Sequence, residues 1–172
     1  MFLRVSALIF FIVFQAASAF ALPDDKNQPM YVQADTVSFN NKTGFSQYIG
    51  HVSVQQGSIH LTAQTAEVHM DTHHQIQEAV AKGTANEQAH YWSLPELNKP
   101  ELNAYADLIR VYPQKHLVYL IGNAKVSQGK DSYSAPEIQY NSETESVFSK
   151  KSPAGKTVIV IHPNDINHLK KP

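Results

Sequence analysis

The sequence has 172 residues, no cysteine and a formal net charge of −1 at pH 7. This length suits one domain held together by its own apolar core, since disulfide bonds are excluded. The near-neutral charge and the lack of a long lysine or arginine run exclude the electrostatic footprint of a nucleic-acid-binding protein.

The N-terminal segment 1–21 has the pattern of a secretory signal peptide. Arg4 supplies a positive charge, Val5–Phe14 is apolar, and small residues follow as far as Ala21. The alternative is a membrane anchor, because the longer apolar run 5–21 is at the short end of the roughly 17 to 25 residues that span a bilayer. We interpret the segment as cleaved, and export without cysteine favours a bacterial periplasm.

The chain after this segment alternates between apolar and polar side chains, as half-buried β-strands do. Expected strands occupy Met30–Asp35 and Thr36–Phe39, and after a turn at Asn40–Gly44 they continue at Phe45–Ile49 and His51–Gln55. Short strands separated by turns, with hardly any helical periodicity, predict an all-β domain.

These first strands repeat later in the chain. A gapless alignment, called the repeat alignment below, lays Val32–Val68 on Ala104–Tyr140, so that GHVSVQQG at Gly50 recurs as GNAKVSQG at Gly122. A weaker copy lies at Ala81–Gln88. Repeated β units that each bury one face need neighbours to cover that face. Since glycines at turns or bends let a sheet curl, the repeat predicts a rolled or stacked sheet with an apolar interior.

The two related halves are expected at about residues 31–69 and 103–141, with a loop at residues 93–103 between them. That loop contains PELN twice, and its two closely spaced prolines disfavour a central strand. The predicted domain covers residues 22–163, and residues 164–172 form a polar C-terminal tail.

The sequence lacks the motifs of common enzymes. It has no cysteine nucleophile, no G-x-S-x-G motif and no phosphate-binding loop, so we expect no catalytic residues and no cofactor. His69, His73 and His74 lie near Asp71, and such side chains can bind zinc or copper. A polar loop between two strands also accounts for them, and the sequence before and after supplies no matched pair of ligands, so we assign no metal, and metal binding at this loop stays an alternative.

Three segments resemble the LptA (OstA-like) family of periplasmic lipopolysaccharide transport proteins. They are Gln28–Asp35 (QPMYVQAD), Tyr48–Gly57 (YIGHVSVQQG) and Leu120–Gly129 (LIGNAKVSQG), and the similarity extends over roughly Gln28–Pro163. His51 stands where the family usually has asparagine.

The resemblance implies an antiparallel β-jellyroll, V-shaped in cross-section, with lipopolysaccharide acyl chains in an apolar groove. It implies a non-enzymatic periplasmic carrier that bridges the inner and outer membranes of a Gram-negative cell in lipopolysaccharide transport and outer-membrane assembly. The implied partners are an inner-membrane transport complex at one edge strand, an outer-membrane translocon at the other, and further copies associated head to tail.

The positions of candidate lipid-binding residues follow from alternation and from the repeat alignment. Burying an acyl chain against them would contribute about 0.8 kcal/mol per CH₂. The candidates are Met30, Val32, Val37, Phe39, Val52, Val54, Leu61, Ile109, Val111, Tyr119, Val126 and Tyr133.

Met30–Asp35 and Thr157–His162 are candidate edge strands of the sheet. In the second of these, Val158 and Ile159 point to opposite faces, so both faces of the strand are apolar. An exposed edge of this kind recruits another strand. We therefore expect a partner there.

Three alternative functions stay open at this point. A membrane-anchored inner-membrane partner of the same fold and pathway would retain the N-terminal apolar segment. A small outer-membrane β-barrel would need strands of about ten residues with aromatic girdles. A metal-dependent enzyme would use the histidine loop at residues 69–74.

Overall fold

The computed structural model describes residues 24–73, 75–144, 146–150, 153 and 155–162. The predicted signal peptide and the predicted tail at 164–172 lie outside these ranges. In the described residues, helix is limited to short 3-10 turns at Asp25–Asn27 (η1) and Pro113–Lys115 (η2). The all-β prediction is confirmed. No helix in these ranges is long and apolar enough to cross a membrane.

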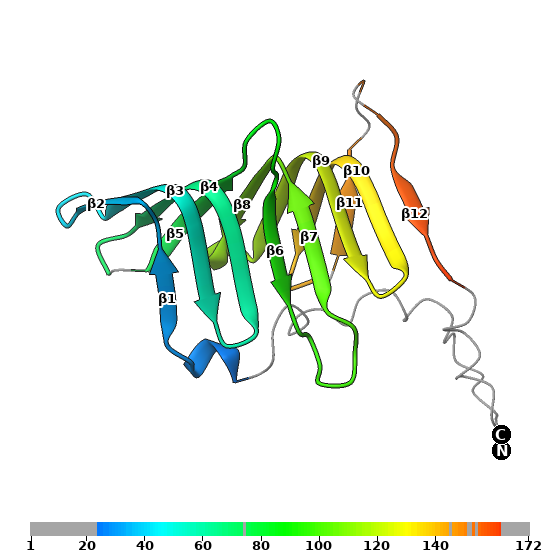
Figure 1. Cartoon of the computed structure of the whole chain (residues 1–172), viewed down its shortest axis with the longest axis horizontal. Coiled ribbons are helices and arrows are strands. Elements are labelled where there is room, and N and C mark those ends of the chain that lie inside the picture. The colour runs from blue at the N-terminus through cyan, green and yellow to red at the C-terminus, as the bar shows by residue number, and fades with distance from the viewer. Residues whose placement is uncertain (1–23, 74, 145, 151–152, 154, 163–172) are drawn as a thin grey trace, which may run out of the picture.

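The strands form one 12-stranded sheet in which every pairing is antiparallel (Figure 1). In chain order they are β1 (Met30–Gln33), β2 (Thr36–Asn40), β3 (Phe45–Gln56), β4 (Ile59–Met70), β5 (Ile76–Lys82), β6 (Ala89–Ser93), β7 (Leu102–Ala106), β8 (Leu108–Tyr112), β9 (Leu117–Gln128), β10 (Asp131–Asn141), β11 (Ser146–Ser149) and β12 (Val158–Val160).

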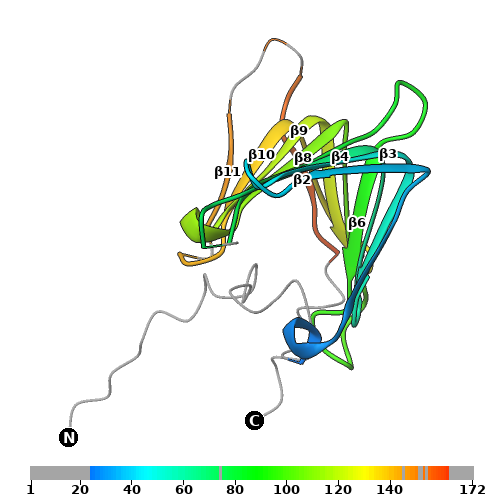
Figure 2. The same cartoon turned by 90° about the vertical axis from the view of Figure 1, so that its left-hand side faces the viewer.

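The sheet is bent into two walls that share the long strands β3, β4, β9 and β10 (Figure 2). The first wall has the order β1-β3-β4-β6-β7-β9-β10-β12, and the second wall has the order β2-β3-β4-β5-β8-β9-β10-β11. Each long strand passes through the bend and contributes one half to each wall. The walls diverge from the bend as a V, with the core between them.

A glycine and the residue after it form the bend in β3 and again in β9. Gly50 and His51 have φ angles of 81° and 45°, and Gly122 and Asn123 have φ angles of 81° and 47°. At both places the register with the next strand shifts, and the long strand carries one extra residue. Such a bulge bends a strand. The expected strands 45–49 and 51–55 are therefore one continuous strand with a bend.

An aspartate holds each bend. The amide N–H of Asp35 donates to the carbonyl of Gly50 at 2.9 Å, and the Asp35 carboxylate lies 2.7 Å from Nδ1 of His51. A Cβ atom at Gly50 would overlap that carboxylate, so glycine is required for space as well as for its positive φ. The counterparts in the second bend, with the same contacts, are Asp107, Gly122 and Asn123.

The contribution of His51 to the stability of the first bend depends on pH. Its hydrogen bond and ion pair with Asp35 raise the pKa of His51 above its ordinary value of 6.5. A group whose pKa is higher in the folded chain stabilises the fold when it is protonated. This contribution is complete below the pKa that His51 has in the unfolded chain, and it is lost as pH rises through the pKa that His51 has in the folded chain. We expect His51→Asn, which copies Asn123, to abolish this contribution. Urea midpoints measured from about pH 5 to about pH 8 should fall more for the wild type than for the variant, and equal slopes would contradict this.

The glutamine of the repeated V-x-Q-G sequence holds the start of each half. Nε2 of Gln56 donates to the carbonyl of Gln28 at 3.1 Å, and Nε2 of Gln128 donates to the carbonyl of Pro100 at 3.1 Å. Each carbonyl lies two residues before the first strand of its half. The repeat is thus a repeat of side-chain contacts as well as of strands.

The last six strands copy the first six. β7 to β10 match β1 to β4 in the repeat alignment, which lays Ser134 on Thr62 and, when extended by two residues toward the N-terminus, Leu102 on Met30. β11 and β12 match β5 and β6 at a slightly shorter spacing, since Val158 lies opposite Ser134 of β10 as His90 lies opposite Thr62 of β4. The halves are joined where β6 pairs with β7, and their connection spans residues 94–101.

Candidate functional site

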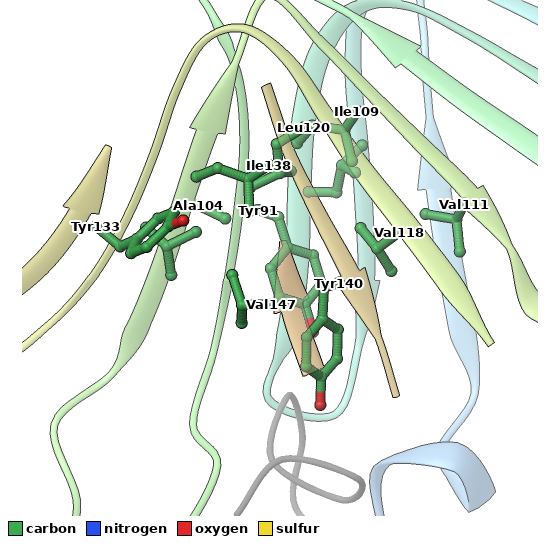
Figure 3. A pocket seen from close by; sticks show the side chains of 12 residues that line it. Tyr91, Ala104, Ile109, Val111, Val118, Leu120, Tyr133, Ile138, Tyr140 and Val147 are labelled. Atoms are coloured by element: carbon green, nitrogen blue, oxygen red, sulfur yellow. The ribbon is translucent and has the colours of Figure 1, made fainter. Parts of the chain in front are cut away.

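An apolar cavity of about 100 Å³ lies between the two walls, mainly against strands of the second half (Figure 3). Every side chain that lines it is aliphatic or a tyrosine. The lining residues are Leu61, Tyr91, Ala104, Ile109, Val111, Val118, Leu120, Val126, Tyr133, Ile138, Tyr140 and Val147.

Strand pairing sets these side chains in rows across the sheet, because residues opposite each other on paired strands point to the same face. The row that faces the cavity from the first wall has no polar side chain other than tyrosine, from one end of the wall to the other. From β1 to β12 its members are Val32, Val54, Leu61, Tyr91, Ala104, Val126, Tyr133 and Ile159.

Two rows of the second wall face the cavity. The first consists of Val37, Tyr48, Ala66, Ala81, Ile109, Leu120, Ile138 and Ser149; the second consists of Phe39, Ser46, Val68, Ala79, Val111, Val118, Tyr140 and Val147. The space between the walls is therefore mostly apolar along its length.

All but one of the candidate residues from the sequence fall into three groups in the structure. Those that line the cavity together are Leu61, Ile109, Val111, Val126 and Tyr133. Val54 belongs to the inward row of the first wall, and Val52 is fully buried beside the bend. Those exposed on β1 and β2, at one open end of the walls, are Met30, Val32, Val37 and Phe39.

Tyr119 does not join the other candidates. It lies on the outer face of the second wall, where its ring meets that of Tyr112 edge-on at a centroid distance of 6.1 Å. Successive side chains of a strand point to opposite faces. The neighbours of Tyr119 in β9, Val118 and Leu120, line the cavity in its place.

Two cavity residues, Ile138 and Tyr140, were missed because the bend changes the alternation in β10. Counting by twos from Tyr133 points Ile138 and Tyr140 outward. The register irregularity between Ala135 and Glu137 turns both residues inward. The sequence held one signal for them, since the repeat alignment lays this pair on apolar positions of the first half.

The tyrosines do not bring charge into the cavity. Burial raises the pKa of Tyr91 to about 12, so its phenol stays neutral at physiological pH. The hydroxyl of Tyr133 donates to Oγ of Ser149 at 2.7 Å. The site therefore suits an uncharged, apolar ligand.

The cavity is small for a ligand site. Pockets that take small molecules have volumes of about 300 to 1,000 Å³, against about 100 Å³ here. A few methylene groups fill that space, so a longer apolar ligand must separate the walls or extend along the rows toward the open ends.

The histidine loop has a structural explanation in its described part. The Asp71 carboxylate accepts the backbone N–H of Gln75 at 2.9 Å and that of His73 at 2.8 Å, and these bonds, that from Gln75 foremost, lower the pKa of Asp71. His74 lies outside the described residues. Within those residues, no group of three or more histidine, cysteine or acidic side chains is placed to hold a metal ion.

Both ends of the walls expose apolar side chains. In the described part of the chain, β1 and β2 pair only with β3, whereas β11 and β12 pair only with β10. Met30 is 54% exposed and Ile159 is 58% exposed. Leu102, the counterpart of Met30 in the second half, is only 3% exposed because β6 covers β7.

Comparisons with known proteins agree on one family. Residues 31–146 match the family model described as LptA/(LptD N-terminal domain) LPS transport protein. The chain is 31% identical over 155 residues to lipopolysaccharide export system protein LptH of Pseudomonas aeruginosa, covering 86% of this chain and 87% of that protein. It is 26% identical over 144 residues to lipopolysaccharide export system protein LptA of Escherichia coli K12, covering 83% of this chain and 76% of that protein.

A solved structure among those that match this chain has the same fold. It is the crystal structure of LptH, described as the LptA homologous periplasmic component of the conserved lipopolysaccharide transport device from Pseudomonas aeruginosa. The TM-score is 0.71 at 30% sequence identity, over 82% of this chain and 100% of that one.

Proposed function

This chain belongs to the LptA/(LptD N-terminal domain) family, as a non-enzymatic periplasmic component of lipopolysaccharide transport, and on this premise we propose that the space between its two walls carries the lipid acyl chains. The family resemblance of Gln28–Asp35, Tyr48–Gly57 and Leu120–Gly129 is confirmed. The acyl chains are the uncharged, apolar part of such a lipid, which matches the chemistry of the space.

One observation carries the proposal. The inward row of the first wall stays apolar from Val32 at one exposed end to Ile159 at the other. A row that served only as a core would be expected to end in polar side chains where it meets solvent. Because each buried methylene group contributes about 0.8 kcal/mol, burial of part of one acyl chain gives useful affinity without any contribution from charge.

The exposed strands at the two ends support a second part of the proposal. We propose that the inner-membrane transport complex binds one edge, that the outer-membrane translocon binds the other, and that copies associate head to tail. Exposed strands with apolar side chains on them bind other strands through backbone hydrogen bonds and pockets for side chains. Val37 and Phe39, both 55% exposed, would be covered at such a junction.

Photo-crosslinking in cells tests the carrier function. Crosslinking groups at Val111 and Val126 point into the space between the walls, so they should capture lipopolysaccharide. The matched control is Tyr119, which is on β9 like Val126 but lies on the outer face, and we expect it to capture little. Equal capture at Val126 and Tyr119 would show that the lipid does not enter between the walls.

A further inference from the structure

The joint between the two halves shows how two edges of this fold meet. There β6 pairs with β7 and β5 pairs with β8. The open strands at one end, β11 and β12, are the copies of β5 and β6. The open strands at the other end, β1 and β2, are the originals of which β7 and β8 are the copies. A second chain can therefore meet the first as the halves meet each other.

The correspondence of β1 to β7 and of β12 to β6 fixes the register of such a junction. Tyr91 lies opposite Ala104 in the internal joint, so Ile159 of one copy lies opposite Val32 of the next. In the second wall, Ala79 lies opposite Val111. The same correspondence extends the inward rows of that wall from one copy into the next.

The internal joint also contains a polar contact at the bend. Nε2 of Gln88 donates to Oδ1 of Asp107 at 3.0 Å, while Nδ2 of Asn123 donates to Oδ2 of the same carboxylate at 2.9 Å. Asp35 is the counterpart of Asp107, and Nδ1 of His51 is within hydrogen-bond distance of Oδ2 of Asp35. In the described residues, no side chain bonds to Oδ1 of Asp35, the atom that corresponds to the acceptor of Gln88.

The counterpart of Gln88 at the open end is Lys156. Gln88 lies two residues before His90 of β6, and Lys156 lies two residues before Val158 of β12, the position that corresponds to His90 by register. Lys156 is exposed, and the Asp35 side chain is 61% exposed. An amide in the internal joint is thus replaced by a cation at the open end.

We propose that Lys156 of one copy binds the Asp35 carboxylate of the next copy in an ion pair that takes the place of the Gln88–Asp107 contact. This inference rests on the proposed head-to-tail association and adds a charged contact to it. The pair lies at the rim of the junction, where water reaches it. Salt screens exposed charges of this kind, so association between copies depends on salt.

Sedimentation velocity over a range of protein and NaCl concentrations tests the ion pair. Self-association of the wild type should weaken as salt rises. Lys156→Glu, which places two negative charges together, should weaken association about threefold to tenfold at low salt. Lys156→Gln restores the amide of the internal joint, so it should keep the association and lose its salt dependence. Thermal melts of the three proteins should agree, since Lys156 is exposed.

A second readout separates this inference from the proposed association. Cysteines placed at Val32 and Ile159 report stacking by forming an interchain disulfide. If that disulfide forms while Lys156→Glu and wild type associate equally, the ion pair is wrong and the stacking stands. If the wild type does not self-associate and the two cysteine variants form no interchain disulfide, both proposals are wrong, and the edges serve other proteins.

Discussion

Chains with Val32→Cys, mixed with chains carrying Ile159→Cys, should form an interchain disulfide in high yield under mild oxidation. The sequence has no cysteine of its own, so any disulfide comes from the introduced pair. In the proposed junction, which copies the register of the internal joint, these two positions lie directly opposite each other. Opposite residues on antiparallel strands have Cβ atoms about 4.5 to 5.5 Å apart, which a small backbone movement brings within disulfide range.

The matched control moves one cysteine to the adjacent position. Tyr31 is next to Val32 in β1 and is 62% exposed, but its side chain points to the opposite face of the strand. Tyr31→Cys mixed with Ile159→Cys should give little disulfide on a non-reducing gel. Similar yields from the two mixtures would rule out the inferred register, because they would reflect random collision.

The second large effect is a contrast in stability between Leu102→Ala and Met30→Ala. Leu102 and Met30 occupy the same position of the repeat, with exposed fractions of 3% and 54%. Truncation of a buried leucine removes about 2 to 5 kcal/mol of unfolding free energy, whereas truncation of an exposed side chain changes it by about 0.5 kcal/mol. Urea unfolding of each variant at low protein concentration measures both values.

The same two variants should exchange roles when association is measured. Met30→Ala removes apolar area that only a second strand can cover, so it should weaken self-association while the unfolding free energy is nearly unchanged. If both variants lose the same unfolding free energy in dilute solution, then β1 is covered within the chain itself, and its edge is not an open one.

Local patterns in the sequence predicted the strands well. Alternation located β1, β2 and β3, and the repeat alignment located their copies β7, β8 and β9. The glycines at Gly50 and Gly122 were expected either at turns between strands or at bends within a strand, and the local pattern did not decide between the two. That distinction depends on Asp35 and Asp107, which belong to earlier parts of the chain and contact the bend only in the folded sheet.

The cavity was harder to predict, because alternation gives the face of a side chain and not what covers it. Val37 and Ile109 are equivalent in the repeat, yet their exposed fractions are 55% and 3%. The difference comes from β5, which lies beside β8 but has no counterpart beside β2 within the described chain. No local pattern contains that information.

The hairpin that joins β6 to β7 has a consequence for assembly. Its connection, residues 94–101, keeps the two strands of the internal joint at a high effective concentration, on the order of millimolar for a short tether. In the proposed head-to-tail association, the strands that meet between copies have no such tether. On that proposal the same pairing is permanent within a chain and reversible between chains, so a bridge built from these units would lengthen or shorten with the supply of protein, while each unit stays folded.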